Sequence, residues 1–107
     1  MGYYTRYELS VVEGNTDLTS EFIEEYENAA YALEQDGSSS TTCKWYEHEK
    51  ELKELSKKHR DALFRLEGEG EESGDIWVKY IRNGQCQTCK AKIVFEDFDE
   101  TKLKWDT

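Results

Sequence analysis

Two strand-like runs meet at Asn83-Gly84, and this dipeptide constrains the fold more than any other feature of the sequence. Both residues tolerate the positive φ angles of a type I′ turn, whose twist matches that of a β-hairpin. A third strand-like run begins at Leu63 and precedes this pair. The sequence therefore predicts a three-stranded antiparallel meander over residues 63–95, which needs a layer to cover its apolar face.

The segment upstream of the meander supplies candidates for that layer. Residues 3–12 alternate between apolar and polar side chains, which predicts a half-buried strand. Apolar residues at three- and four-residue spacing then predict one helix, with Thr19 as N-cap and Gly37 just beyond its end. Residues 43–46 are a short strand candidate, and residues 47–59 are expected to form a second, thinner amphipathic helix.

The element order β-α-β-α-β-β-β predicts an α+β fold. We expect one domain over residues 1–107, with an antiparallel sheet of four to five strands and two helices packed on one face. In the last strand the alternation predicts four inward side chains: Cys89, Ala91, Ile93 and Phe95. The acidic tail, residues 97–107, is expected to be partly flexible, with some of its apolar residues tucking back. No apolar run has the length of a membrane span, so no membrane contact is expected.

The chain carries 24 acidic and 14 basic residues, a formal net charge of −10. Residues 1–36 hold nine acids and one base, and the glycine-rich segment 67–75 holds five acids and no base. Such a chain repels nucleic acid and is attracted to basic protein surfaces. An alternative is that the acids only keep the chain soluble. The candidate partner-binding residues are Glu21, Glu24, Glu25, Glu27, Glu67, Glu69, Glu71, Glu72 and Asp75.

A smaller group of basic and aromatic residues lies on the predicted meander. Aromatic rings can stack on nucleobases, and lysine or arginine can hold a phosphate. These residues keep open a different function, the sequestration of a signalling nucleotide on the sheet. The candidate ligand face consists of Trp77, Lys79, Arg82, Lys90 and Lys92.

Cys86 and Cys89 have the spacing of a zinc or redox pair, and Cys43 and His48 could complete a zinc site. Residues three apart in a strand point to opposite faces, which separates the two sulfurs. We therefore expect neither a metal site, nor a cofactor, nor catalytic residues, although the sequence leaves metal binding by this cysteine pair open. Three cysteines, an odd number, fit a reducing compartment better than a disulfide framework.

Several stretches resemble a group of small bacteriophage and prophage proteins. They are the opening Met1-Gly-Tyr-Tyr-Thr-Arg-Tyr, the segment Lys44–Glu49, the segment Leu66–Trp77, which contains Gly-Glu-Gly-Glu-Glu-Ser-Gly-Asp-Ile-Trp, and the segment Ile93–Phe98. The resemblance brings no catalytic or binding residue with it. It implies a phage protein made in the cytoplasm of an infected bacterial host. Small acidic phage proteins often inhibit host or defence machinery, including CRISPR complexes, which is an argument by analogy.

These observations predict a small acidic protein without enzymatic activity. We expect it to bind a basic surface of a host or defence complex that handles nucleic acid, by occlusion or by nucleic-acid mimicry, and not to bind nucleic acid directly. The oligomeric state is left open, and a homo-oligomer is compatible with the sequence.

Overall fold

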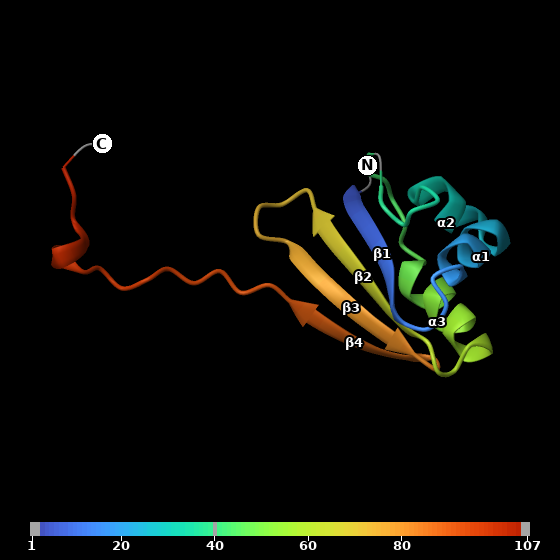
Figure 1. Cartoon of the computed structure of the whole chain (residues 1–107). Helices are drawn as coiled ribbons and strands as arrows, with labels where there is room; N and C mark the ends of the chain where they lie inside the picture. The colour runs from blue at the N-terminus through green and yellow to red at the C-terminus, as the bar shows by residue number, and fades with distance from the viewer. Residues whose placement is uncertain (1–2, 40, 106–107) are drawn as a thin grey trace.

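The computed structural model describes residues 3–39 and 41–105. Four strands form one sheet, three helical segments lie together on one of its faces, and a long tail extends away from both (Figure 1). The elements in chain order are β1 (Thr5–Glu13), α1 (Leu18–Glu25), α2 (Glu27–Ala32), α3 (His48–Lys58), β2 (Leu63–Gly70), β3 (Ile76–Arg82), β4 (Gln85–Lys90) and a 3₁₀ turn, η1 (Glu100–Lys102).

The sheet is antiparallel throughout, and its strand order is β1-β2-β3-β4. The hairpin between β3 and β4 is the predicted two-residue turn, in which Asn83 has φ 48° and Gly84 has φ 77°. Arg82 therefore pairs with Gln85, and this pairing sets the register of β4. The predicted α+β fold, with helices packed against an antiparallel sheet, is confirmed.

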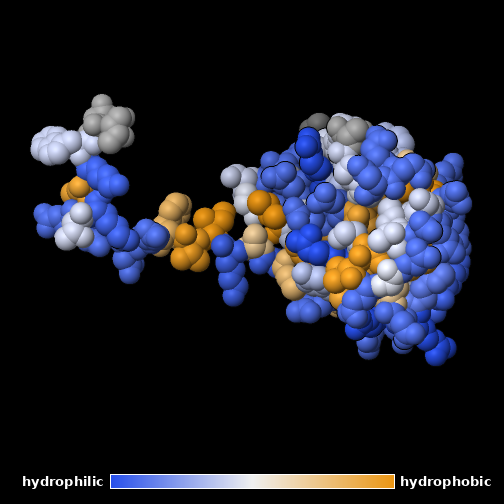
Figure 2. Space-filling model, in the orientation of Figure 1, coloured by the Kyte–Doolittle hydropathy of each residue, from blue (hydrophilic) through white to orange (hydrophobic). Residues whose placement is uncertain are grey.

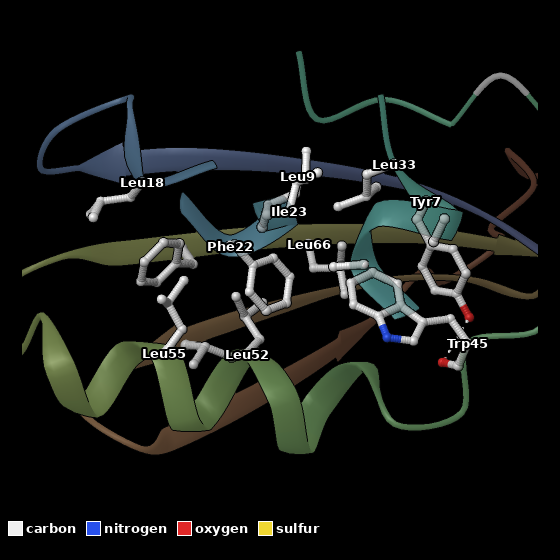
Figure 3. Close-up of a cluster of buried hydrophobic side chains, with 14 of the residues drawn as sticks. Tyr7, Leu9, Leu18, Phe22, Ile23, Leu33, Trp45, Leu52, Leu55 and Leu66 are labelled. Atoms are coloured by element: carbon white, nitrogen blue, oxygen red, sulfur yellow. Dashed lines mark hydrogen bonds between the residues drawn. The ribbon is translucent and has the colours of Figure 1, made fainter. Parts of the chain in front are cut away.

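The hydrophobic core lies between the helices and one face of the sheet (Figure 3). Phe22 of α1, Leu52 and Leu55 of α3, and Phe64 and Leu66 of β2 are all fully buried. The alternation predicted for β1 is confirmed by its burial pattern, since every second side chain from Thr5 to Leu9 is buried. The two leucines of α3 provide most of its apolar stripe, as the sequence predicts.

The first predicted helix is broken into two at Tyr26, which adopts an extended conformation with φ −117° and ψ 118°. The break changes the phase of the apolar positions, so that Ala29 and Ala32 are buried while Ala30 is exposed. The sequence does not predict this break in the helix, because neither proline nor glycine lies near Tyr26. The predicted N-cap is also wrong, since Asp17 precedes the first turn of α1.

The predicted strand at residues 43–46 does not form. Within this segment only Cys43 makes a backbone bridge to the sheet, an isolated one to Thr5. The neighbouring segment instead runs along the outer edge of β1, where Leu9 N–H donates to the Gly37 carbonyl at 2.7 Å and Ser39 N–H to the Tyr7 carbonyl at 3.0 Å. The sheet therefore has four strands, and the edge of β1 is covered.

The predicted inward set in the last strand is wrong. The register places Cys86 beside the buried Ile81, so Cys86 faces the helices and Cys89 faces the opposite, uncovered side of the sheet. The strand also ends at Lys90, before Ile93 and Phe95, and those two side chains are exposed. The apolar residues of the tail, which were expected to tuck back, are exposed as well. No helix in the described ranges is long and apolar enough to cross a membrane.

Candidate functional site

A cavity of about 330 Å³ opens between the start of α3 and the end of the sheet at which β3 begins. Its volume lies at the lower end of the range of small-molecule sites, about 300–1,000 Å³. The cavity combines aromatic rings with two lysines and one carboxylate. Its lining consists of Tyr3, Thr5, Tyr46, His48, Asp75, Trp77, Lys79, Thr88 and Lys90.

The floor of this cavity is a stack of two rings. The imidazole of His48 lies on the indole of Trp77, with ring centroids 5.1 Å apart and planes 17° apart. Tyr7 packs against both rings from β1. Gly68 is paired with Trp77 across the sheet, and a Cβ at this glycine would lie 2.2 Å from the indole. The absence of a side chain at position 68 thus leaves the space that the Trp77 ring occupies.

The proton on His48 is placed by two hydrogen bonds. Nδ1 lies 2.7 Å from the carbonyl oxygen of Trp45, which can only accept, so Nδ1 carries the proton. Nε2 then accepts a hydrogen bond from the Lys79 ammonium at 2.8 Å. Burial lowers the pKa of His48 below its ordinary value, and the adjacent Lys79 charge acts in the same direction. His48 is therefore neutral near pH 7, which is the state that this arrangement requires.

Lys79 connects the cavity to a second carboxylate on α3. Its ammonium lies 3.9 Å from Glu49, and a hydrogen bond from the Cys86 thiol lowers the pKa of the Glu49 carboxyl. Burial, followed by the contact with Glu49, raises the pKa of Cys86. The thiol therefore stays protonated near neutral pH, which opposes a role as nucleophile.

The rim of the cavity is formed by the turn between β2 and β3. The Tyr3 hydroxyl donates to Asp75 at 2.5 Å and accepts from Glu72 N–H at 3.0 Å, while Tyr4 N–H donates to Glu71 at 2.5 Å. These contacts hold the turn of the acidic segment against the N-terminal segment. Of the acidic segment 67–75, residues 67–70 belong to β2 and only residues 71–75 lie outside the strands.

The five residues of the predicted ligand face are divided by the structure. Trp77, Lys79 and Lys90 share the helix-covered face of the sheet and line the cavity. Arg82 lies on the other face and forms an ion pair with Glu13 at 2.6 Å. Lys92 lies in the tail, beyond the end of β4. Because side chains alternate along β3, Lys79 and Arg82 point to opposite faces of the sheet, which their charges alone do not indicate.

The acids of α1 lie on the helical layer. Glu21 is 2.8 Å from His59 Nε2, and Glu25 contacts Lys58, so two of the four predicted acids are held by the C-terminal end of α3. Glu24 and Glu27 are exposed, and among the residues that the structure describes no ion pair involves them. We call these four glutamates the α1–α2 acidic surface.

The acids predicted to act with them lie elsewhere. Glu67 and Glu69 belong to β2 and point to the uncovered face of the sheet, where Glu67 is paired across the strands with Glu8 and forms an ion pair with Arg65 at 3.2 Å. The remaining three, Glu71, Glu72 and Asp75, belong to the turn at the rim of the cavity. The nine predicted partner-binding acids are thus spread over three surfaces.

The cysteine pair does not converge. Cys86 and Cys89 face opposite sides of β4, as strand alternation predicts, and Cys43 is buried beside β1. Over residues 3–39 and 41–105, no group of three or more His, Cys, Asp or Glu side chains is placed to hold a metal ion.

His48 is the residue of this site that sequence reasoning missed. The sequence suggested His48 only as a possible zinc ligand beside the cysteines, yet its ring is part-buried between Trp45 and Trp77. One signal was present, since His48 follows Trp45 by three residues at the start of α3. Chemically, the cavity can stack a flat ring and contact an anionic group at Lys90.

Comparison with family models, curated proteins and solved structures finds no significant match to this chain.

Proposed function

We propose that this protein is a non-enzymatic acidic binding protein that attaches to a basic surface of a nucleic-acid-handling complex and blocks it. One observation carries the proposal. Between Tyr7 and Cys43 the chain has nine acids and no lysine, arginine or histidine, and this segment supplies α1 and α2 on the outside of the molecule. A surface with one sign of charge attracts a partner of the opposite sign.

The α1–α2 acidic surface is the part of the molecule that fits this role best. Its exposed glutamates present carboxylates on a folded helical layer, where basic groups that bind phosphates would meet them. Glu67 and Glu69 belong to a different interface, because they lie on the opposite layer of the molecule. We therefore propose that the glutamates of α1 and α2 alone mimic a nucleic acid, rather than all nine acids that the sequence suggested.

The identity of the partner class rests on the resemblance to small phage proteins. A phage protein acts in the cytoplasm of an infected bacterium, where host and defence complexes present positively charged grooves to DNA or RNA. An acidic protein of this size blocks such a groove by occupying it, which requires no chemistry.

Affinity purification from infected cells at increasing salt tests the proposal. A specific partner should be retained at low salt and released as salt screens the contact. The double variant Glu24→Lys/Glu27→Lys should lose the partner. Glu69→Lys/Glu72→Lys is the matched control, because it changes the net charge equally at other surfaces. Equal retention of the partner by both variants would refute the assignment to α1 and α2.

The cavity supports a second candidate function, the sequestration of a small anionic ligand with a flat ring. The specific observation is the stack of His48 on Trp77 beside Lys79 and Lys90. Calorimetry with a panel of nucleotides tests it, together with analysis of any ultraviolet-absorbing ligand that co-purifies. Binding should be lost in Trp77→Ala and kept in Arg82→Gln, since Arg82 lies on the other face. No heat with any nucleotide would remove this candidate.

A further inference from the structure

The two edges of the sheet differ in how they are covered. The outer edge of β1 is hydrogen-bonded to the backbone of Gly37, Ser39 and Cys43, with Thr5 and Cys43 exchanging two backbone bonds of 2.9 and 3.0 Å. No described segment pairs with the outer edge of β4, which is the last strand in the sheet order. An open edge is a ready template for pairing with another strand.

The tail continues from this open edge and exposes its apolar residues. Its last backbone bond to the sheet is from Ala91 N–H to the Ile76 carbonyl, at 2.9 Å. Directly beyond it, Ile93, Val94 and Phe95 are 68%, 83% and 87% exposed. Figure 2 shows hydrophobic residues clustered on the part of the tail nearest the domain. Three adjacent exposed apolar residues on an extended segment are unusual for a monomer and typical of an interaction site.

The alternation of β4 determines where these side chains would point if the strand were longer. Cys89 and Ala91 lie on the uncovered face of the sheet, beside Val78 and Ile76. Continued alternation puts Ile93 and Phe95 on that same face. This face already carries half-buried apolar side chains along β3, namely Val78 and Tyr80. An extended β4 would therefore enlarge an existing apolar face.

We propose that residues 85–93 pair in antiparallel fashion with the same segment of a second copy of this chain, which joins the two four-stranded sheets into one. The arrangement is a two-fold symmetric dimer in which one surface is complementary to itself. Backbone hydrogen bonds would satisfy the open edge of β4, and Ile93 of each tail would lie beside β4 of the other copy on the uncovered face of the joined sheet.

Because this segment lacks acids, it is a part of the chain at which two copies of an acidic protein can approach with little repulsion between carboxylates. Residues 85–95 contain Lys90 and Lys92 and no acid, in a chain whose net charge is −10. Pairing through β4 also keeps the acidic helices of the two copies apart, because α1 packs on β1 at the far side of the sheet. A self-association that brought the acidic surfaces together would be opposed by repulsion.

The lysines also select a register. Odd-numbered residues of β4 bond to β3, so even-numbered residues present N–H and C=O groups to the open edge. A register centred on Cys89 places Lys90 opposite Thr88 of the second copy, whereas one centred on Lys90 places like charges opposite each other. The Cys89 register brings the two Cys89 residues together as a non-hydrogen-bonded pair, with Cα atoms about 4.5 Å apart, which a disulfide can span.

Sedimentation velocity of the full chain over a dilution series tests the proposal. We expect a concentration-dependent dimer in the unaltered chain. Lys92→Pro removes an N–H that only the second copy would use, and Phe95→Glu puts a charge among the apolar side chains that would line the uncovered face beside the second copy, so both variants should be monomeric with unchanged circular dichroism. Trp105→Glu is the control, because Trp105 is exposed in the tail outside the paired segment. A chain that is monomeric at every concentration, or a dimer that survives both variants, overturns the proposal.

Oxidative crosslinking tests the register independently. A variant with Cys43→Ser and Cys86→Ser retains Cys89 alone, and should form a disulfide-linked dimer under mild oxidation. A variant that retains Cys86 alone should not, because Cys86 faces α3 in its own copy. Equal crosslinking of both variants, or of neither, would refute the Cys89 register.

Discussion

The hydroxyl of Ser56 accepts a hydrogen bond from Gly84 N–H at 2.8 Å and so connects α3 to the turn between β3 and β4. Ser56 also donates to the Lys53 carbonyl at 2.7 Å and is completely buried. The hairpin turn and the helix that covers it are thus linked by one side chain, 28 residues away from its partner in the sequence.

Ser56→Ala should destabilise the fold, because it leaves the part-buried Gly84 N–H without its acceptor. We expect a loss of about 1–3 kcal/mol in the free energy of unfolding, measured by urea denaturation with tryptophan fluorescence. Ser10→Ala is the control, since Ser10 is exposed, and its effect should stay within about 0.5 kcal/mol. Equal stability of the two variants would show that the Ser56 bond contributes nothing.

His48 should give the protein a stability that depends on pH. Burial lowers its pKa in the folded state, so between that value and the unfolded pKa of about 6.5 the unfolded chain binds more protons. The contribution of His48 is therefore complete above pH 6.5 and is lost as the pH falls through the folded pKa. Chemical denaturation between pH 7 and pH 5 measures this decline.

One variant attributes the decline to His48. His48→Gln should flatten it, because no titrating ring remains beside Lys79. In histidine-detected NMR, the proton on Nδ1 of His48 identifies the tautomer directly. A folded pKa for His48 at or above 6.5 would contradict the arrangement described here.

Gly68→Ala should disturb the cavity floor. The new methyl group would overlap the Trp77 indole, so the ring must leave its stack with His48. Overpacking of this kind costs about 1–3 kcal/mol, and the emission of Trp77 should change with its surroundings. Glu69→Ala, on the neighbouring residue but the opposite face, should leave the emission unchanged. An unaltered spectrum in Gly68→Ala would mean that the cavity accommodates the methyl group.

Tyr3→Phe should loosen the acidic turn. The Tyr3 hydroxyl holds Asp75 and the Glu72 amide, and its hydrogen bond to Asp75 raises the pKa of Tyr3. Without it, amide hydrogen exchange over residues 71–75 should accelerate, while exchange in the β3–β4 hairpin stays the same. Tyr31→Phe serves as the control, because the Tyr31 ring is exposed. Unchanged exchange in the turn would show that other contacts hold it.

The elements that the sequence predicted correctly are those fixed by local chemistry. Asn83-Gly84 determines its own turn, and Leu52 and Leu55 determine the buried stripe of α3. Gly37 was identified as a special position but for the wrong reason, since it does not end a helix. Its Cβ would lie 2.2 Å from the Leu9 carbonyl, so the glycine permits close approach to β1. That approach depends on tertiary packing, which no local pattern records.

The candidate site was less predictable for the same reason. Trp77, Lys79 and Lys90 were selected from the sequence, and the structure brings them together. Arg82 was grouped with them because its charge was considered without its position in the alternation of β3. His48 and Tyr46 reach the cavity only because the segment before α3 crosses the end of the sheet, an arrangement that long-range contacts decide.

The positions of the helices over the sheet have a consequence for how partners assemble. Because α3 covers β3 and β4 while α1 packs on β1, the acidic helices and the open β4 edge are at opposite sides of the molecule. If both proposed contacts form, occupation of one would not obstruct the other. Two copies joined at β4 would present two acidic surfaces facing outward, and a target with repeated basic sites would then be held with the avidity of a bivalent ligand.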